Sequence, residues 1–168
     1  MEYQNLRFLQ ESLLKTQGIF SWSLTKAGQL LYSNAPDQEY YEKLLHQSTT
    51  KEIILSHFSE RHVPLIAVDE LGLAWIAACQ DEKEEETFSL LHLLGPVRSI
   101  EMTESYLKQN PSPVLRDDYL SYLRRLPTLL SDVAVRYACL LAASISETTI
   151  TPDMVEILTP PMPKTEAP

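Results

Sequence analysis

The pattern of apolar and polar residues predicts an amphipathic helix at the start of the chain. Leucines recur at spacings of three and four within Tyr3–Lys15, which places them along one side of a helix. Gly18 stands where a C-terminal cap is expected, because glycine adopts a left-handed backbone conformation without strain. The predicted apolar side holds Leu6, Leu9 and Leu13, and the residues expected to point elsewhere are Arg7, Gln10 and Glu11.

The next segment has a period of two and predicts a β-hairpin. Apolar residues, Trp22 among them, alternate with serines in Ile19–Leu24, so one side of this strand is apolar. The turn Lys26-Ala27-Gly28 leads into a second strand at Leu30–Ser33.

Two helices are expected after this hairpin. Asp37–His46 is polar enough for a short surface helix. Thr49 and Glu52 have the spacing of a capping box, in which the two side chains satisfy free backbone N–H groups at the start of a helix. The apolar run that begins at Ile53 continues that second helix.

Three more strands are predicted between residues 64 and 94. Pro64–Val68 and Leu73–Cys79 are apolar, β-rich runs that form a second hairpin, and Phe88–Leu94 is a third run that ends at Gly95-Pro96. The charged segment Asp81–Glu86 is predicted to be a solvated loop and not a binding motif. The pattern therefore predicts five strands, with helices inserted between the first two and the last three.

The second half of the chain is predicted to be helical. Helices are expected at Met102–Gln109, at Val114–Arg125 and at Pro127–Ser146, where Pro127 suits a first helical turn. Apolar residues at spacings of three and four form a stripe on the last helix, which either packs within its own core or forms a dimer interface. The residues assigned to dimerisation are Leu130, Val133, Tyr137, Leu140 and Leu141.

These elements predict an α+β fold organised in three parts. Residues 1–100 are expected to form an antiparallel five-stranded sheet with flanking helices, and residues 101–150 a set of helices that pack on it or dimerise. Residues 151–168 are predicted to be a Pro-rich linker, because the last ten residues contain four prolines.

Composition narrows the function classes. The 168 residues are 44% hydrophobic and 22% charged, as in an ordinary globular protein. Fourteen Lys and Arg against 23 Asp and Glu give a net charge of −9, which opposes direct binding to nucleic acid or an anionic membrane. Cys79 and Cys139 lie far apart in apolar surroundings, and no leader or membrane-spanning pattern is present, which favours a reducing cytoplasmic location.

The motifs of common enzyme classes are missing from the sequence. The four glycines are too far apart for a phosphate-binding loop, and no GxSxG or HExxH pattern occurs. His57 and His62 are five residues apart, which does not place them on one side of a helix for metal binding. The sequence therefore predicts no enzymatic activity, no metal and no cofactor.

Aromatic and titratable residues on the predicted strands suggest a small-molecule pocket. His92 interrupts an apolar run, and Trp75 has alanines on both sides of it in the sequence, which leaves room for a cavity or for closely packed helices. Burial of these side chains in an ordinary core explains the same pattern. The residues assigned to ligand binding are Trp22, Trp75, Cys79 and His92.

The predicted order of elements resembles a PAS or GAF-type sensor domain. The strand Leu91–Val97 with its Gly-Pro end, the segment from Leu115-Arg116-Asp117-Asp118 to Leu126-Pro127, and Arg136–Leu140 are together similar to the N-terminal regulatory segment of a group of bacterial AraC-family transcription regulators. The resemblance implies a homodimeric domain that senses an unidentified small molecule and contacts DNA only through a helix-turn-helix module expected after Pro168. The alternative is a non-sensing protein-interaction module whose core is filled by its own side chains.

Overall fold

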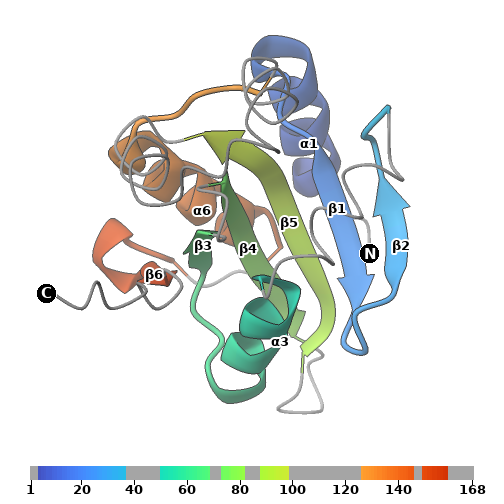
Figure 1. The fold of residues 1–168 in the computed structure, drawn as a ribbon, viewed down its shortest axis with the longest axis vertical. Coiled ribbons are helices and arrows are strands. Elements are labelled where there is room, and N and C mark those ends of the chain that lie inside the picture. The colour runs from blue at the N-terminus through green and yellow to red at the C-terminus, as the bar shows by residue number, and fades with distance from the viewer. Residues whose placement is uncertain are drawn as a thin grey trace, which may run out of the picture.

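The computed structural model describes residues 4–36, 50–68, 73–81, 88–98, 126–145 and 149–158, which form one mixed sheet with helices on both of its sides (Figure 1). The strands are β1 (Ser21–Thr25), β2 (Leu30–Ser33), β3 (Leu65–Val68), β4 (Leu73–Asp81), β5 (Phe88–Arg98) and β6 (Glu156–Leu158). The helices are α1 (Gln4–Gln17), α3 (Thr50–Glu60) and α6 (Ser131–Ile145), with a short 3-10 helix, η1, at Pro152–Met154.

The strands lie in the order β2-β1-β5-β4-β3-β6. The first five pair antiparallel, whereas β6 pairs parallel with β3. The predicted α+β class is confirmed, but the sheet has six strands and is mixed, where five antiparallel strands were expected.

The sixth strand lies inside the segment that was predicted to be a linker. Glu156–Leu158 runs beside Leu65–Ala67, and the Glu156 backbone N–H donates to the Pro64 carbonyl at 3.0 Å. The added strand covers an edge of β3 that would otherwise leave backbone groups unpaired. Three residues are too few to show the alternation by which strands are predicted.

The N-terminal helix and the two hairpins form where the sequence predicts them. α1 ends at Gln17, and Gly18 has a φ of 68° and donates its N–H to the Leu14 carbonyl at 3.1 Å, as a helix cap does. Gly28, with a φ of 85°, makes the turn between β1 and β2. β3 and β4 form the second hairpin.

β5 is longer than the sequence predicts. The expected strand ended at Gly95-Pro96, whereas β5 continues to Arg98. The register shifts between Ala74 and Ile76, so that Gly95 and Pro96 of β5 together lie opposite the single residue Trp75 of β4 and form a bulge. Since a bulge leaves a residue out of the hydrogen-bond ladder, it accommodates a proline that has no N–H to donate.

α6 begins later than predicted, at Ser131 and not at Pro127. The Arg98 N–H donates to the Pro127 carbonyl and the Leu129 N–H to the Arg98 carbonyl, so the backbone before the helix is paired with the end of β5. These hydrogen bonds are incompatible with a helical turn at the same residues.

The sheet separates two cores. One lies between the sheet and α3, and the other between the sheet and the pair α1 and α6 (Figure 1). Side chains alternate along β4: Trp75, Ala77 and Cys79 belong to the α3 side, and Ala74, Ile76 and Ala78 to the α6 side. Small residues of α6 meet the small residues of β4, which lets the helix approach the sheet closely; they are Ala134, Ala138 and Ala142.

Other predicted elements lie outside the described residues. They are the helices at 37–46, 102–109 and 114–125, and most of the acidic segment 81–86. No helix among the described residues is both long enough and apolar enough to span a membrane.

Candidate functional site

Three of the four predicted ligand-binding residues lie together on the α3 side of the sheet. The Trp22 and Trp75 rings meet edge to face, with centroids 6.1 Å apart, and Cys79 belongs to the same cluster. The Trp22 indole N–H donates to the Gly95 carbonyl at 2.9 Å, and the Cys79 thiol lies 3.9 Å from the His62 carbonyl. Trp22 is 1% exposed and Trp75 is 0% exposed.

Bulky apolar side chains surround the two tryptophans. Phe58 and Ile54 reach this core from α3, and Leu91 and Leu93 from β5, and all four are buried. Tight burial and an indole that already has a hydrogen-bond partner are typical of a packed core. In this part of the protein the tryptophans therefore act first as structural residues.

His92 lies on the other side of the sheet, which corrects the assumption that all four residues surround one pocket. It pairs with Ser23 on β1 and with Ala78 on β4, and its ring points toward α1 and α6 and away from the tryptophans. The physical reason is the two-residue period of a strand: Leu91 and Leu93 face α3, so His92 between them faces the opposite way.

A line of polar side chains crosses three strands at His92. Its Nδ1 is 2.8 Å from the Ser23 Oγ, and its Nε2 is 3.1 Å from the Gln80 Oε1. Burial lowers the pKa of His92 to about 4, so the ring is neutral at physiological pH and carries one N–H. Because the Gln80 carbonyl oxygen can only accept, the N–H is on Nε2, and the Ser23 hydroxyl donates to Nδ1.

An open groove adjoins this polar line, between α1 and the β1–β2 hairpin. Its volume is about 710 Å³. Ser23 lies in its wall, so the hydroxyl that His92 orients is also presented to the groove. The lining residues are Gln4, Leu6, Arg7, Gln10, Glu11, Ser23 and Tyr32.

Gln10 is the unusual residue of this groove. It is 5% exposed, yet no hydrogen bond to its side chain is made within the part of the chain that the structure describes. Gln10 was expected to point away from the apolar side of α1, but it is buried together with Leu6 and Leu13. The available signal was its spacing: Gln10 is four residues after Leu6 and three before Leu13, so it belongs to a helical stripe.

Among the described residues that line the groove, one is positively and one negatively charged. Arg7 and Glu11 are four residues apart on α1, and both are exposed. Neither forms an ion pair within the described ranges. The described lining of the groove therefore has no net charge. It offers a cation, Arg7, that can donate hydrogen bonds and an anion, Glu11, that can accept them.

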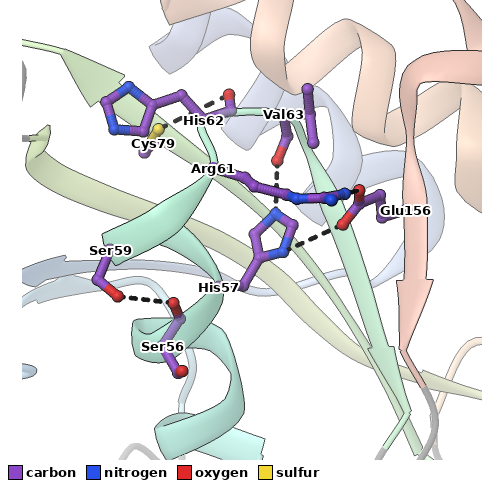
Figure 2. A network of polar contacts seen from close by, with 8 residues as sticks. All are labelled: Ser56, His57, Ser59, Arg61, His62, Val63, Cys79 and Glu156. Atoms are coloured by element: carbon purple, nitrogen blue, oxygen red, sulfur yellow. Dashed lines mark hydrogen bonds and ion pairs between the residues drawn. The ribbon is translucent and has the colours of Figure 1, made fainter.

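A second polar network joins the end of α3 to β6 (Figure 2). The buried His57 ring donates from Nε2 to the Val63 carbonyl at 2.9 Å, while its Nδ1 lies 3.3 Å from a Glu156 carboxylate oxygen. Arg61 pairs with the other oxygen of Glu156. These contacts link helix to edge strand, and their chemistry is that of a structural ion pair.

The predicted dimerisation stripe divides between the core and the surface. Leu141 is buried against the sheet, and Val133 and Tyr137 pack partly against the same core. Leu130 and Leu140 are 52% and 50% exposed. Only part of the stripe is therefore available to a second copy, and dimerisation stays a prediction.

Metal and thiol chemistry find little support in the described part of the chain. No group of three His, Cys, Asp or Glu residues there could hold a metal ion. Cys79 and Cys139 form no disulfide within the described residues. Burial, and secondarily the charge of Asp153, raise the pKa of Cys139, which disfavours its thiolate.

Comparisons with protein-family models, with curated protein sequences and with solved structures found no match. Function must therefore be argued from the site itself.

Proposed function

We propose that this chain is a cytoplasmic small-molecule-sensing domain of a transcription regulator, and that its effector binds in the groove between α1 and the β1–β2 hairpin. The observation that carries the proposal is Gln10, a nearly buried amide that lines an open groove without a hydrogen bond from any described residue. Gln10 is not among the described residues whose polar side-chain atoms are sealed from solvent without a partner, so its amide is open to the groove and a ligand can replace water as its hydrogen-bond partner, at about 0.5–1.5 kcal/mol for each bond.

The position of α1 supports a sensing role. α1 forms one wall of the groove and also packs against α6, with which it shares a core. A ligand that draws α1 toward the hairpin also changes the packing of α1 against α6. The bound and free states therefore differ at the interface between these two helices. Differential binding to two such arrangements is the physical basis of a ligand response.

The assignment to transcription control rests on the sequence resemblance to AraC-family regulatory segments. A net charge of −9 supports a division of labour in which DNA contacts belong to a separate basic module. No DNA-reading element is needed in the described sheet and helices for this role.

Homodimerisation belongs to the same proposal, with α6 as the contact. Leu140 on α6 and Leu130, the residue before its first turn, expose large apolar side chains, and regulators that read paired half-sites are two-fold dimers. Leu140→Glu should shift the protein from dimer to monomer in sedimentation equilibrium without loss of structure. Leu31→Glu, at an exposed leucine on β2, is the matched control, and an unchanged mass for Leu140→Glu would contradict this interface.

The groove is tested with a library of small fragments of mixed charge, screened by thermal shift against the full chain. Fragments that stabilise the wild-type protein should lose at least about tenfold in affinity with Gln10→Leu, which fills the same space without the amide. Gln17→Leu, at an exposed position of the same helix, should leave them unchanged. Equal binding to both variants and the wild type would contradict the proposal.

The alternative function is a protein-interaction module that senses nothing. The packed tryptophan cluster favours it, because this side of the sheet is filled by the protein's own side chains. Exposed Leu31 and Tyr32 on the edge strand β2 would then be part of the partner surface. If no fragment of the library binds in the groove, the result supports this alternative.

A further inference from the structure

We infer that the groove selects a small zwitterion that carries a primary ammonium group and a carboxylate, as free α-amino acids do, with the ammonium donating to Ser23 and Glu11 and the carboxylate paired with Arg7. This inference rests on the proposed function, because it names the ligand class of the same groove. Three features of the groove lead to it.

The first feature is the direction of the Ser23 hydroxyl. Gln80 accepts from Nε2 of His92, so Nδ1 is left to accept, and the Ser23 O–H points at it. The hydroxyl hydrogen is used, and what Ser23 offers the groove is the lone pairs of its oxygen. A ligand group that meets Ser23 must therefore be a donor, and a carboxylate or carbonyl at this position would meet oxygen with oxygen.

The second feature is the pair of opposite charges one helical turn apart. Arg7 and Glu11 have the spacing of a helical ion pair, yet no ion pair joins them in the described structure. Both charges face the groove, and a ligand with one charge of each sign complements them without leaving the groove with a net charge. A simple cation would leave Arg7 unpaired, and a simple anion would leave Glu11 unpaired.

The third feature is the mixed character of the remaining wall. Leu6 is buried and apolar, the Tyr32 ring is 45% exposed, and the Gln10 amide can both donate and accept. A small skeleton with an apolar side chain satisfies Leu6 and Tyr32, while Gln10 bonds either charged group. A volume of about 710 Å³ in an open groove admits such a molecule.

The test compares L-leucine with two analogues that keep its carbon skeleton. 4-Methylpentanoate lacks the ammonium group, and 3-methylbutylamine lacks the carboxylate. Nuclear magnetic resonance titration of the full chain should show L-leucine binding at least about tenfold more tightly than either analogue, since each analogue loses a charge-assisted hydrogen bond. L-Serine and L-phenylalanine are titrated beside it to allow for side-chain preference. Equal affinity of an analogue and the amino acid overturns the inference.

Two pairs of variants separate the recognising groups from the fold. Ser23→Ala should weaken amino-acid binding about tenfold, while Ser21→Ala, two residues away on the same side of β1 and outside the groove lining, should not. Glu11→Gln keeps the size of an exposed helix residue and should weaken binding similarly, against Glu52→Gln on α3 as the control. Loss of binding in the controls, or its retention in Ser23→Ala and Glu11→Gln, contradicts the inference.

The tautomer of His92 gives a readout that needs no ligand. Nitrogen chemical shifts of the ring should show the proton on Nε2, and a proton on Nδ1 would overturn the inference while leaving the proposed function standing. If every fragment that binds in the groove is uncharged or carries a single charge, the inference is likewise overturned and the proposed function still stands. If neither amino acids nor fragments shift the groove residues, the proposed function fails together with the inference.

Discussion

The two sides of the sheet differ in chemistry, although the same strands form both. The α3 side buries two tryptophans, Phe58 and several leucines, and the polar atom of Trp22 is bonded to a backbone carbonyl. The side facing α1 and α6 carries Ser21, Ser23 and His92 on its strands, and a groove opens beside them. Among the described residues, one side of the sheet is therefore a packed core, and the other combines a core under α6 with polar side chains beside a groove.

A second contrast exists within the α1 and α6 side itself. Over β3 and the part of β4 up to Ala78, α6 packs closely through alanines against apolar strand residues. Over β1 and β5, the sheet presents hydroxyl and imidazole groups, and α1 brings a glutamine to meet them. The close apolar packing and the polar groove are therefore separated along the sheet as well as across it.

The largest expected effect comes from emptying the tryptophan core. Trp75→Ala should lower the free energy of unfolding by about 4 kcal/mol, because Trp75 is fully buried among large side chains that cannot close the space. Urea denaturation measures this, with Leu31→Ala as an exposed control that should change little. A decrease in the free energy of unfolding well below about 3 kcal/mol would show that the core on the α3 side is not tightly packed, and would contradict the difference between the two sides of the sheet.

The next effect is acid sensitivity on the opposite side. The pKa of His92 is about 4 in the folded protein and 6.5 in the unfolded chain, so the unfolded state binds a proton first as the pH falls. The neutral ring of His92 contributes its full share to the free energy of unfolding above pH 6.5, and this share should be lost progressively as the pH falls to 4. Each unit of difference between the two pKa values corresponds to 1.36 kcal/mol, so the total loss is up to about 3 kcal/mol.

His92→Gln removes this titration and supplies the comparison. The difference in unfolding free energy between wild type and His92→Gln should shrink between pH 7 and pH 4, as followed by denaturant titrations at each pH. A constant difference over this range would mean that His92 is not held neutral by burial, and would weaken the assigned direction of the Ser23 hydroxyl.

How far the sequence predicted this arrangement depends on the length of each pattern. α1 and both hairpins follow from periodicity and from glycines that permit positive φ, such as Gly18 and Gly28. β6 was missed because three residues carry no period and its pairing with β3 is a long-range contact. The extension of β5 was missed because a bulge, which sequence does not show, accommodates Pro96.

The candidate site was harder to predict than the fold. Grouping His92 with Trp22 and Trp75 assumed that residues on neighbouring strands share a side, but the side depends on register. Gln10 was put on the wrong side of α1 because Leu6, Leu9 and Leu13 suggested a slightly rotated stripe. In a short helix with few apolar residues, the sequence determines the direction of the buried side only to within about one residue position.

A smaller effect tests how closely α6 approaches the sheet. Ala138→Leu should destabilise the protein by about 2 kcal/mol, since Ala138 is fully buried opposite alanines of β4 and extra methyl groups overfill the contact. Ala143→Leu, on the exposed side of the same helix, is the matched control and should be nearly neutral. Equal stability of the two variants would argue for a cavity under α6.

The smallest effect concerns the polar link between α3 and β6. Glu156→Gln should cost about 1 kcal/mol, because Arg61 is exposed and its ion pair is screened by water, while the contact with buried His57 is weakened. Amide exchange should speed up at Glu156, which bonds to the Pro64 carbonyl, and not in β1. Unchanged exchange at β6 would show that backbone pairing alone holds this strand.

The separation of a sealed core from an open polar groove is tested most directly by mapping where small molecules bind. Nitrogen-resolved spectra of the full chain, recorded with the fragment library, should show shifts at the Gln10 side-chain amide and the Ser23 backbone amide, with the indole signals of Trp22 and Trp75 unmoved. Shifts at the two indoles, with the groove signals unchanged, would contradict the account and place the ligand site on the α3 side.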